Sequence, residues 1–214
     1  MKRLLIASLL LLGTLAETPV QAQQTLKPVD QAISQPDFFT FRARLQAALV
    51  RRDVEAVLAV VHKDIKNSFG GNDGIDEFKK TWSLDKPDSK LWETLATVLA
   101  LGGSFEAEGA FTAPYVFTNW PEAFDAFDYM AVTGSGVRVR AEPNTSAPTL
   151  ATLSFSMVEC LPDNDPDKPW VSIRLPGGKT GYIDRRYVRS SIDYRASFSK
   201  IDGRWQLTFF LAGD

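Results

Sequence analysis

Cysteine and histidine are almost absent from this chain, which has one of each among 214 residues. A single cysteine cannot form a disulfide within the chain. One cysteine with one histidine excludes the usual zinc sites, which are built from several such side chains. The sequence also contains neither an H-E-x-x-H metal motif nor a G-x-S-x-G nucleophile turn. We therefore expect no metal ion, no cofactor and no enzymatic activity.

The sequence also lacks an excess of positive charge. Its 24 basic and 26 acidic residues give a formal net charge of −2. Nucleic-acid-binding domains use a basic surplus to neutralise phosphates, so nucleic acid is not an expected partner. The composition, with 44% hydrophobic and 23% charged residues, is that of a globular protein and excludes a mostly disordered chain.

The longest apolar run stands at the N-terminus. Basic residues at positions 2 and 3 precede an apolar stretch at 4–12, and Val20-Gln21-Ala22 provides a small-x-small cleavage site. This layout is typical of a secretory signal peptide. The apolar stretch is shorter than the ~20 residues that span a bilayer, which argues against a transmembrane helix. We expect residues 1–22 to be removed, which leaves Gln23 as the first residue of an exported, periplasmic or secreted protein without stable membrane insertion.

The first half of the mature chain has the periodicity of helices. After a leader at 23–36, which we expect to be loose, apolar residues recur at spacings of three and four over 37–101. We predict four short helices there, with Asp53 as the N-cap of the second and two glycines at 102–103 ending the fourth. Three further segments are expected to follow: short strands at 105–107 and 115–117, and an aromatic, acidic connector at 120–128.

From residue 129 the pattern changes to short alternating strands separated by turns, a spacing typical of a small barrel. A last pair of alternating segments, 194–198 and 205–209, brackets Asp202-Gly203. This dipeptide is a strong signal for a tight hairpin turn, because both central residues of such a turn need positive φ and the Asp-Gly pair is favoured there. The fold class is therefore expected to be α+β.

Five ordered motifs in the strand-rich region resemble the bacterial SH3 (SH3b) family. They are Gly136–Pro143, Ala147–Leu153, Trp170–Arg174, Gly177–Ile183 and Tyr187-Val188. They resemble, in order, the V-N-V-R-x-x-P strand of that family, the segment after it, its W-x-x-V strand, its N-G-x-x-G-W-V turn and its closing Y-L pair. The resemblance covers residues 129–189. It implies a small SH3-like β-barrel that recognises peptidoglycan or a protein of the cell envelope.

The flanking region resembles the nuclear-transport-factor-2-like fold more weakly. Its helical first half and the ending Phe198–Phe210 are similar to that family, which closes with an F-x-x-x-x-G-x-W-x-I-x-x-F pattern. This resemblance implies helices wrapped on a curved sheet around a cone-shaped pocket. Few strands are evident between 102 and 128 to build such a sheet.

These patterns predict four parts of the chain. They are a signal peptide at 1–22, a leader at 23–36, a helical α+β domain at 37–128 completed by a C-terminal β-hairpin at 191–214, and an SH3b barrel at 129–190. The barrel is expected to be inserted in the helical domain or to follow it. The hairpin is expected to pack on the helical half, because the barrel pattern is already complete at Val188.

The residues capable of acid, base or nucleophilic chemistry are crowded together. His62, Asp64 and Ser68 could form a Ser/His/Asp set, but all three lie within seven residues and triads draw their members from separate elements. We expect His62 to continue the second helix, where a histidine near the C-terminus favours the helix dipole. Residues 68–74 are expected to form a turn and helix cap, and Cys160 is expected to act as a small hydrophobe.

Binding is the better prediction, with candidate residues on the barrel and at the domain junction. They are Tyr115, Trp120, Tyr129, Arg138, Arg140, Trp170 and Tyr182. The aromatic residues at the junction either line a ligand groove or join the barrel to the helices. We expect an exported, non-enzymatic binding protein. The alternatives are a small-ligand pocket protein or enzyme built on the flanking domain, and a structural or assembly factor of the envelope.

Overall fold

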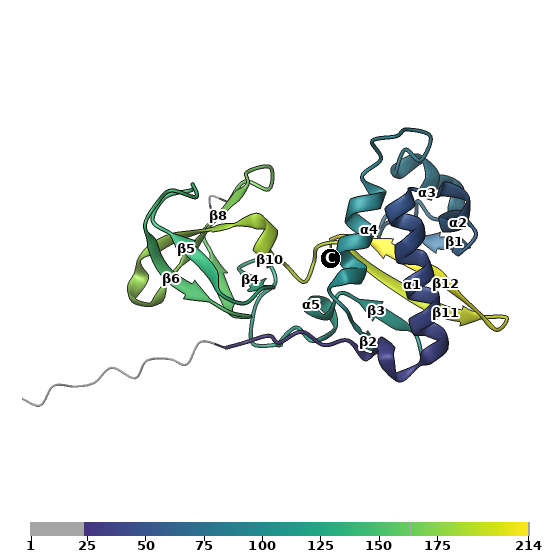
Figure 1. Ribbon diagram of the computed structural model, residues 1–214, viewed down its shortest axis with the longest axis horizontal. Helices are drawn as coiled ribbons and strands as arrows, with labels where there is room; N and C mark the ends of the chain where they lie inside the picture. Colours follow the sequence, from purple (N-terminus) through teal and green to yellow (C-terminus); the bar gives the residue numbers. More distant parts are fainter. Residues whose placement is uncertain (1–23, 163, 214) are drawn as a thin grey trace, which may run out of the picture.

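The computed structural model describes residues 24–162 and 164–213, and the expected signal peptide lies outside them. The described chain is a mixed α+β protein with two sheets (Figure 1). One sheet has five strands and is packed against helices, and the other has seven strands. No helix in the described part of the chain is both long enough and apolar enough to cross a membrane.

Four α-helices form within the region where helical periodicity was found. They are α1 (Pro36–Arg51), α2 (Val54–Leu58), α3 (Ile75–Thr81) and α4 (Leu91–Ala100), preceded by a short 3-10 helix η1 (Gln31–Ser34). Asp53 caps α2 as predicted, because its carboxylate accepts a hydrogen bond of 3.0 Å from the backbone N–H of Ala56. Just after α4, Gly102 has φ of +67°, a conformation that glycine adopts without strain.

The prediction that His62 continues the second helix is wrong, because residues Val61–Lys66 form strand β1. Val61 and Ile65 are buried while the side chains between them are more exposed. A spacing of four fits one turn of a helix, but it equally fits two alternations of a strand. The pairing of β1 with the C-terminal strand decides between them, since Val61 lies opposite Leu207 in parallel register.

The C-terminal hairpin lies inside the first sheet. Its strands are β11 (Arg195–Ile201) and β12 (Arg204–Leu211), and the sheet order is β1-β12-β11-β3-β2 with β2 at Ser104–Phe105 and β3 at Phe111–Ala113. Asp202 and Gly203 have φ of +47° and +77°, which confirms the predicted turn. The hairpin therefore separates β1 from β3, and the first half of the chain cannot form this sheet without the last residues.

The prediction of a strand at 115–117 is wrong, because Tyr115–Thr118 form the short helix α5. The backbone N–H of Phe117 donates to the carbonyl of Pro114, which closes the first turn of this helix. The strand lies just before it, at β3, where Phe111 and Ala113 are buried beside β11. The aromatic side chains of 115–117 were compatible with a strand, but the proline before them begins a helical turn.

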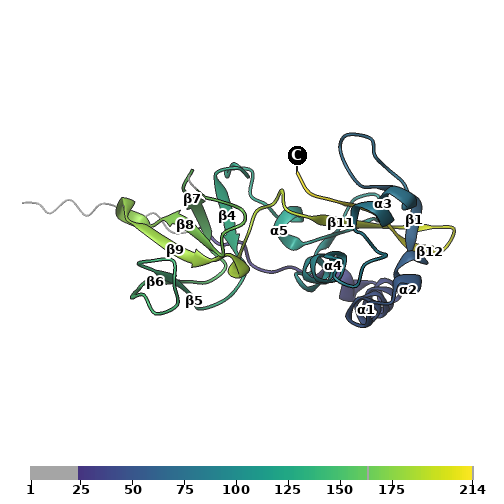
Figure 2. The same cartoon turned by 90° about the horizontal axis from the view of Figure 1, so that it is seen from above.

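Helices α1 and α4 cover one face of the five-stranded sheet (Figure 2). Phe38 of α1 is completely buried at the centre of this interface. Its ring lies 4.3 Å from that of Phe111 and 4.8 Å from that of Trp205, measured between ring centroids. Phe41, Phe105 and Phe198 also surround it. Aromatic rings thus fill the space between α1 and the sheet.

The second sheet is built from seven short antiparallel strands in the order β10-β4-β7-β8-β9-β5-β6. Their bounds are β4 Tyr129–Val132, β5 Val137–Arg140, β6 Thr149–Leu153, β7 Met157–Cys160, β8 Trp170–Arg174, β9 Thr180–Asp184 and β10 Val188–Arg189. Two 3-10 turns, η2 (Pro176–Gly178) and η3 (Arg185–Tyr187), flank β9. In the described residues the hydrogen-bonded order begins at β10 and ends at β6, so the structure shows a seven-stranded sheet and not a closed barrel.

The leader that we expected to be loose is instead packed against both sheets. We call residues 24–35 the strap. At one end, Leu26 is buried and its backbone N–H donates to the carbonyl of Phe155 at 2.7 Å. At the other end, the N–H of Gln31 donates to the carbonyl of Gly103 at 2.9 Å. The strap runs from the seven-stranded unit to the helical unit (Figure 1).

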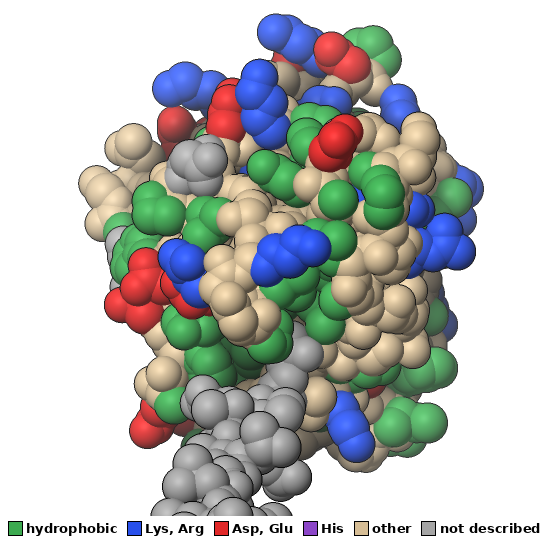
Figure 3. Space-filling view, turned by 90° about the vertical axis from the view of Figure 1, so that its left-hand side faces the viewer, with side chains coloured by type: hydrophobic (Ala, Val, Ile, Leu, Met, Phe, Trp, Pro, Cys, Tyr) green, Lys and Arg blue, Asp and Glu red, His purple; other side chains and the backbone are tan. Residues whose placement is uncertain are grey.

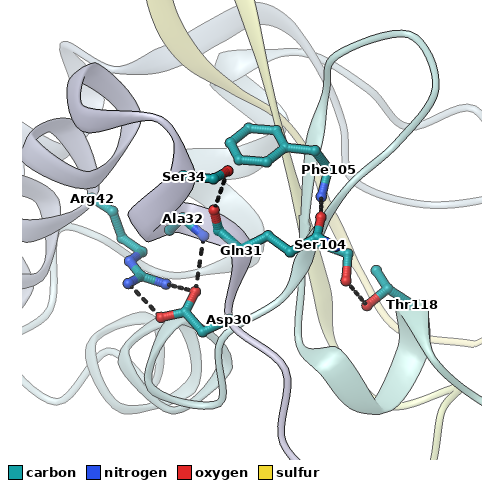
Figure 4. A network of polar contacts seen from close by, with 8 residues as sticks. All are labelled: Asp30, Gln31, Ala32, Ser34, Arg42, Ser104, Phe105 and Thr118. Carbon is teal, nitrogen blue, oxygen red and sulfur yellow. Dashed lines mark hydrogen bonds and ion pairs between the residues drawn. The ribbon is translucent and has the colours of Figure 1, made fainter.

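Side chains fix the helical end of the strap (Figure 4). The carboxylate of Asp30 accepts one hydrogen bond from each terminal nitrogen of Arg42, and the side-chain carbonyl of Gln31 accepts one from the backbone N–H of Phe105. Glycine is required where the strap crosses the end of α4. A Cβ atom on Gly102 would lie 2.5 Å from the carbonyl oxygen of Val29. The strap was missed because its polar composition hides these long-range contacts.

Candidate functional site: a groove on the seven-stranded sheet

A groove of about 330 Å³ opens on the surface of the seven-stranded unit. The side chains that carry charge or aromatic rings in its lining are Arg138, Arg140, Trp170, Asp184, Arg186 and Tyr187. Figure 3 views the molecule from the side of this unit and shows basic, acidic and hydrophobic side chains interspersed on the surface. Three of the residues predicted to bind, Arg138, Arg140 and Trp170, therefore line one groove.

The alternation of β5 places both arginines on the outer face of the sheet. Val137 and Val139 point inward and are 7% and 0% exposed. Arg138 and Arg140 point the other way, as the period of two in a strand requires. The outward position of the arginines is thus fixed by the burial of the valines between which they lie.

The alternation of side chains along a strand also places residues of β8 and β9 on this outer face. Val171 and Ile173 are completely buried, so Trp170 faces outward. Trp170 lies opposite Asp184 in the antiparallel register. Tyr182 of β9 lies opposite Arg140 on the same face, although it is next to the groove and does not line it. Four of the seven predicted residues therefore share one face of the sheet.

One ion pair lies within the lining of the groove. The guanidinium of Arg186 contacts the carboxylate of Asp184 at 2.6 Å. The hydrogen bond from Arg186 holds the pKa of Asp184 below its usual range, and the same bond raises the pKa of Arg186. The guanidinium carbon of Arg186 also lies 5.7 Å from the ring centroid of Tyr187, whose side chain is 45% exposed. Arg186 and Tyr187 come from η3, and Asp184 is the last residue of β9. The doubled arginine beside an aromatic residue was the signal in the sequence that could have pointed to η3.

The two arginines of β5 have no carboxylate partner in the described part of the chain. Arg140 donates through Nη1 to the carbonyl of Ala147 at 2.8 Å and to the hydroxyl of Thr149 at 3.3 Å. Both acceptors are neutral, so its charge is not compensated. Arg138 is exposed. The groove therefore presents two uncompensated positive charges beside Trp170 and Tyr187.

The three remaining predicted residues lie at the junction between the two units, away from the groove. Tyr115 is completely buried, and this desolvation raises its pKa to about 12. Its side chain cannot contact a ligand in solution in this structure. Trp120 donates from its indole N–H to the carbonyl of Phe124, and Tyr129 packs edge-on against the Phe124 ring with centroids 4.7 Å apart. These side chains join the two units together with Leu26 of the strap.

In the described part of the chain, the side chains of His62 and Ser68 form hydrogen bonds with nearby backbone groups and not with each other. His62 accepts a hydrogen bond through Nδ1 from the backbone N–H of Asp64, and the hydroxyl of Ser68 accepts one from the backbone of Asn72. Burial raises the pKa of the Cys160 thiol to about 11, which keeps it protonated at neutral pH. Within the described residues, no three or more His, Cys, Asp or Glu side chains are placed to hold a metal ion.

The groove on the seven-stranded sheet is thus the place where the predicted binding residues converge. Comparison of the chain with protein-family models, with curated proteins and with solved structures returned no match.

Proposed function

We propose that the chain is an exported, non-enzymatic binding protein whose seven-stranded unit is an SH3b-type module that recognises a component of the cell envelope, either peptidoglycan or a protein. The observation that carries this proposal is the convergence of Arg138, Arg140 and Trp170 on one groove. A concave site with aromatic walls and a few polar groups is the usual form of a binding site.

The positions of the SH3b-like motifs support the assignment of the module. The first motif coincides with β5, and the W-x-x-V motif coincides with β8. Gly177 and Gly178 both have positive φ in the turn before β9. Gly181 is needed because a Cβ atom there would lie 2.4 Å from a methyl carbon of Val139. The glycines of the resemblance thus stand where this backbone requires them.

The helical unit fits a supporting role better than the alternative of a small-ligand pocket. Its sheet, with β1 parallel to β12, is compatible with the nuclear-transport-factor-2-like resemblance. In that family the ligand pocket lies between the helices and the sheet, and here Phe38, Phe111 and Trp205 occupy this space. Recognition is assigned to the groove of the other unit, because three of the residues predicted to bind line it.

Retention by envelope fractions tests this proposal. The protein from Gln23 onward is incubated in parallel with intact peptidoglycan and with envelope extract, and the bound fraction is measured. We expect retention by one of the two, with loss in Arg138→Ala and Tyr187→Ala. Arg174→Ala is the matched control, because Arg174 lies on β8 but pairs with Glu159 outside the groove. Retention that is equal in all three variants would place recognition elsewhere.

A further inference from the structure

Positively charged side chains outnumber negatively charged ones in the lining of the groove. Arg138, Arg140 and Arg186 face it with one carboxylate, that of Asp184. Asp184 is held by Arg186, so this pair contributes no net charge. Arg138 and Arg140 remain, and no salt bridge is found for either one in the described part of the chain. A ligand that fills the groove meets two positive charges that the protein itself does not neutralise.

The two arginines differ in how firmly they are held. The bonds from Arg140 Nη1 to Ala147 and Thr149 fix the plane of its guanidinium. Its Nε and Nη2 donors have no partner among the described residues, and a guanidinium offers its donors in a fork that matches the two oxygens of a carboxylate. Arg138 stands two residues earlier on the same face, roughly 7 Å away along the strand, and it is exposed. One arginine is therefore oriented in advance and the other can close on a bound anion.

The rest of the lining limits the kind of anion. Trp170 and Tyr187 supply aromatic surface, which favours an anion attached to an apolar or planar group. The Asp184 carboxylate lies in the same lining, but its pairing with Arg186 leaves only the charges of Arg138 and Arg140 for an anion. A single carboxylate carries one charge and is matched by a forked donor.

We infer that the groove recognises a peptide through a free carboxylate, with Arg140 and Arg138 binding the two oxygens and with Trp170 and Tyr187 packing on the adjoining residues. This inference rests on the proposed function for the location of the site and names the chemical class of its ligand. Arg138 determines the preference for acidic peptides, because its charge is the more accessible of the two.

The test uses the full mature protein and two small probes. N-acetyl-alanyl-alanine carries a free carboxylate, and N-acetyl-alanyl-alaninamide is the same peptide without the charge. Binding is followed by the NMR shifts of the arginine Nε–H and tryptophan indole N–H groups, assigned by substitution. We expect the acid to bind at least about tenfold more tightly than the amide, since hydrogen bonds to a charged group are worth that factor or more. Added salt should weaken the binding of the acid.

Variants connect the preference to the groove. Arg138→Ala should reduce the affinity for the acid about tenfold, and Arg138→Lys should reduce it less, because lysine keeps the charge but loses the fork. Arg174→Ala, the control on β8, should leave it unchanged.

Equal binding of acid and amide, or no shift of the groove signals with the acid, overturns the inference. Binding of N-acetylglucosamine in place of the acid also overturns it and assigns the groove to sugars. These outcomes are separate from the proposed function. Retention by peptidoglycan or extract that depends on Tyr187 would stand even if the two peptides bound equally, and peptide binding without any such retention would count against the envelope partner only.

Discussion

The carboxylate of Asp30 accepts two hydrogen bonds, at 2.7 and 2.8 Å, from the guanidinium of Arg42. Arg42 is nearly buried in α1 with a side chain 8% exposed, and Asp30 belongs to the strap. The pair fixes the helical end of the strap (Figure 4). A buried arginine needs such a partner, because an uncompensated charge in this position is costly.

Removing this carboxylate should destabilise the protein. Asp30→Ala leaves Arg42 without its partner and also removes the side chain that accepts from the backbone of Ala32. We expect the free energy of unfolding to fall by about 1–3 kcal/mol, measured by urea denaturation. Asp76→Asn is the control, since Asp76 is 93% exposed in its pair with Lys79 and should change stability by less than about 0.5 kcal/mol. Equal effects of the two changes would show that the strap is not held by this pair.

A methyl group at Gly103 should disturb the crossing of the strap and β3. A Cβ atom there would lie 2.1 Å from the carbonyl oxygen of Thr112, which is backbone and cannot rotate away. Gly103→Ala should lower the free energy of unfolding by about 1–3 kcal/mol or more, as overpacking does. Gly70→Ala is the control, because the nearest atom to its Cβ is a side-chain oxygen 3.8 Å away. Thermal melting of both variants decides the matter, and an unshifted midpoint for Gly103→Ala would contradict the structure.

Deleting residues 193–214 should unfold the helical unit. The deletion removes β11 and β12, and with them Phe198, Leu207 and Phe210, which are almost completely buried. Burying one such side chain contributes about 1.5–3 kcal/mol, and a domain has only about 5–15 kcal/mol of net stability. Circular dichroism should show loss of the helical signal with the strand signal partly retained. A truncated protein that keeps both its helical signal and its melting temperature would refute this prediction.

Asp37 should make stability depend on acid pH. Its pKa is lowered to about 2, because Lys200 and the indole N–H of Trp205 donate hydrogen bonds to its carboxylate. A lowered pKa contributes stability that is complete above the unfolded value near 3.8 and is lost as the pH falls through 2. Unfolding of the protein and of Asp37→Asn should therefore be compared between pH 5 and pH 2. We expect the difference between them to shrink as the pH falls, and a constant difference would be evidence against this pair.

His62→Ala should leave the protein folded and its binding intact. His62 lies on β1 with a half-exposed side chain, and its hydrogen bond is local, accepted from the backbone N–H of Asp64. Stability should change by less than about 0.5 kcal/mol, and retention by envelope fractions should be unchanged. A hydrolytic activity that this change abolishes would show that the proposal of a non-enzymatic protein is wrong.

Features set by neighbouring residues could be predicted from the sequence. The turn at Asp202-Gly203 was predicted because positive φ is a property of those residues themselves. The outward position of the arginines of β5 follows from their alternation with the buried Val137 and Val139. Three of the six charged or aromatic residues that line the groove, Arg138, Arg140 and Trp170, could be predicted from such local patterns.

Features set by distant partners could not be predicted in this way. The segment at β1 has a spacing that fits helix and strand equally, and only its pairing with β12 decides between them. Arg186 and Tyr187 reach the groove from the turn η3, whose place depends on the whole sheet. Tyr115 was a candidate binding residue, but it is completely buried among residues of both units.

The position of the hairpin between β1 and β3 has a consequence for the order in which a nascent chain can mature. β1 emerges early, yet its hydrogen-bonding partner β12 comes about 140 residues later, so the pairing closes a very long loop. The strands of the seven-stranded sheet lie between them in sequence, and in the described part of the chain their neighbouring strands all belong to that same sheet. The seven-stranded sheet can therefore form before β11 and β12, which the five-stranded sheet needs, have been synthesised. We therefore expect the pairing of β1 with β12 to be a late step in folding, and pairings so distant in sequence form slowly.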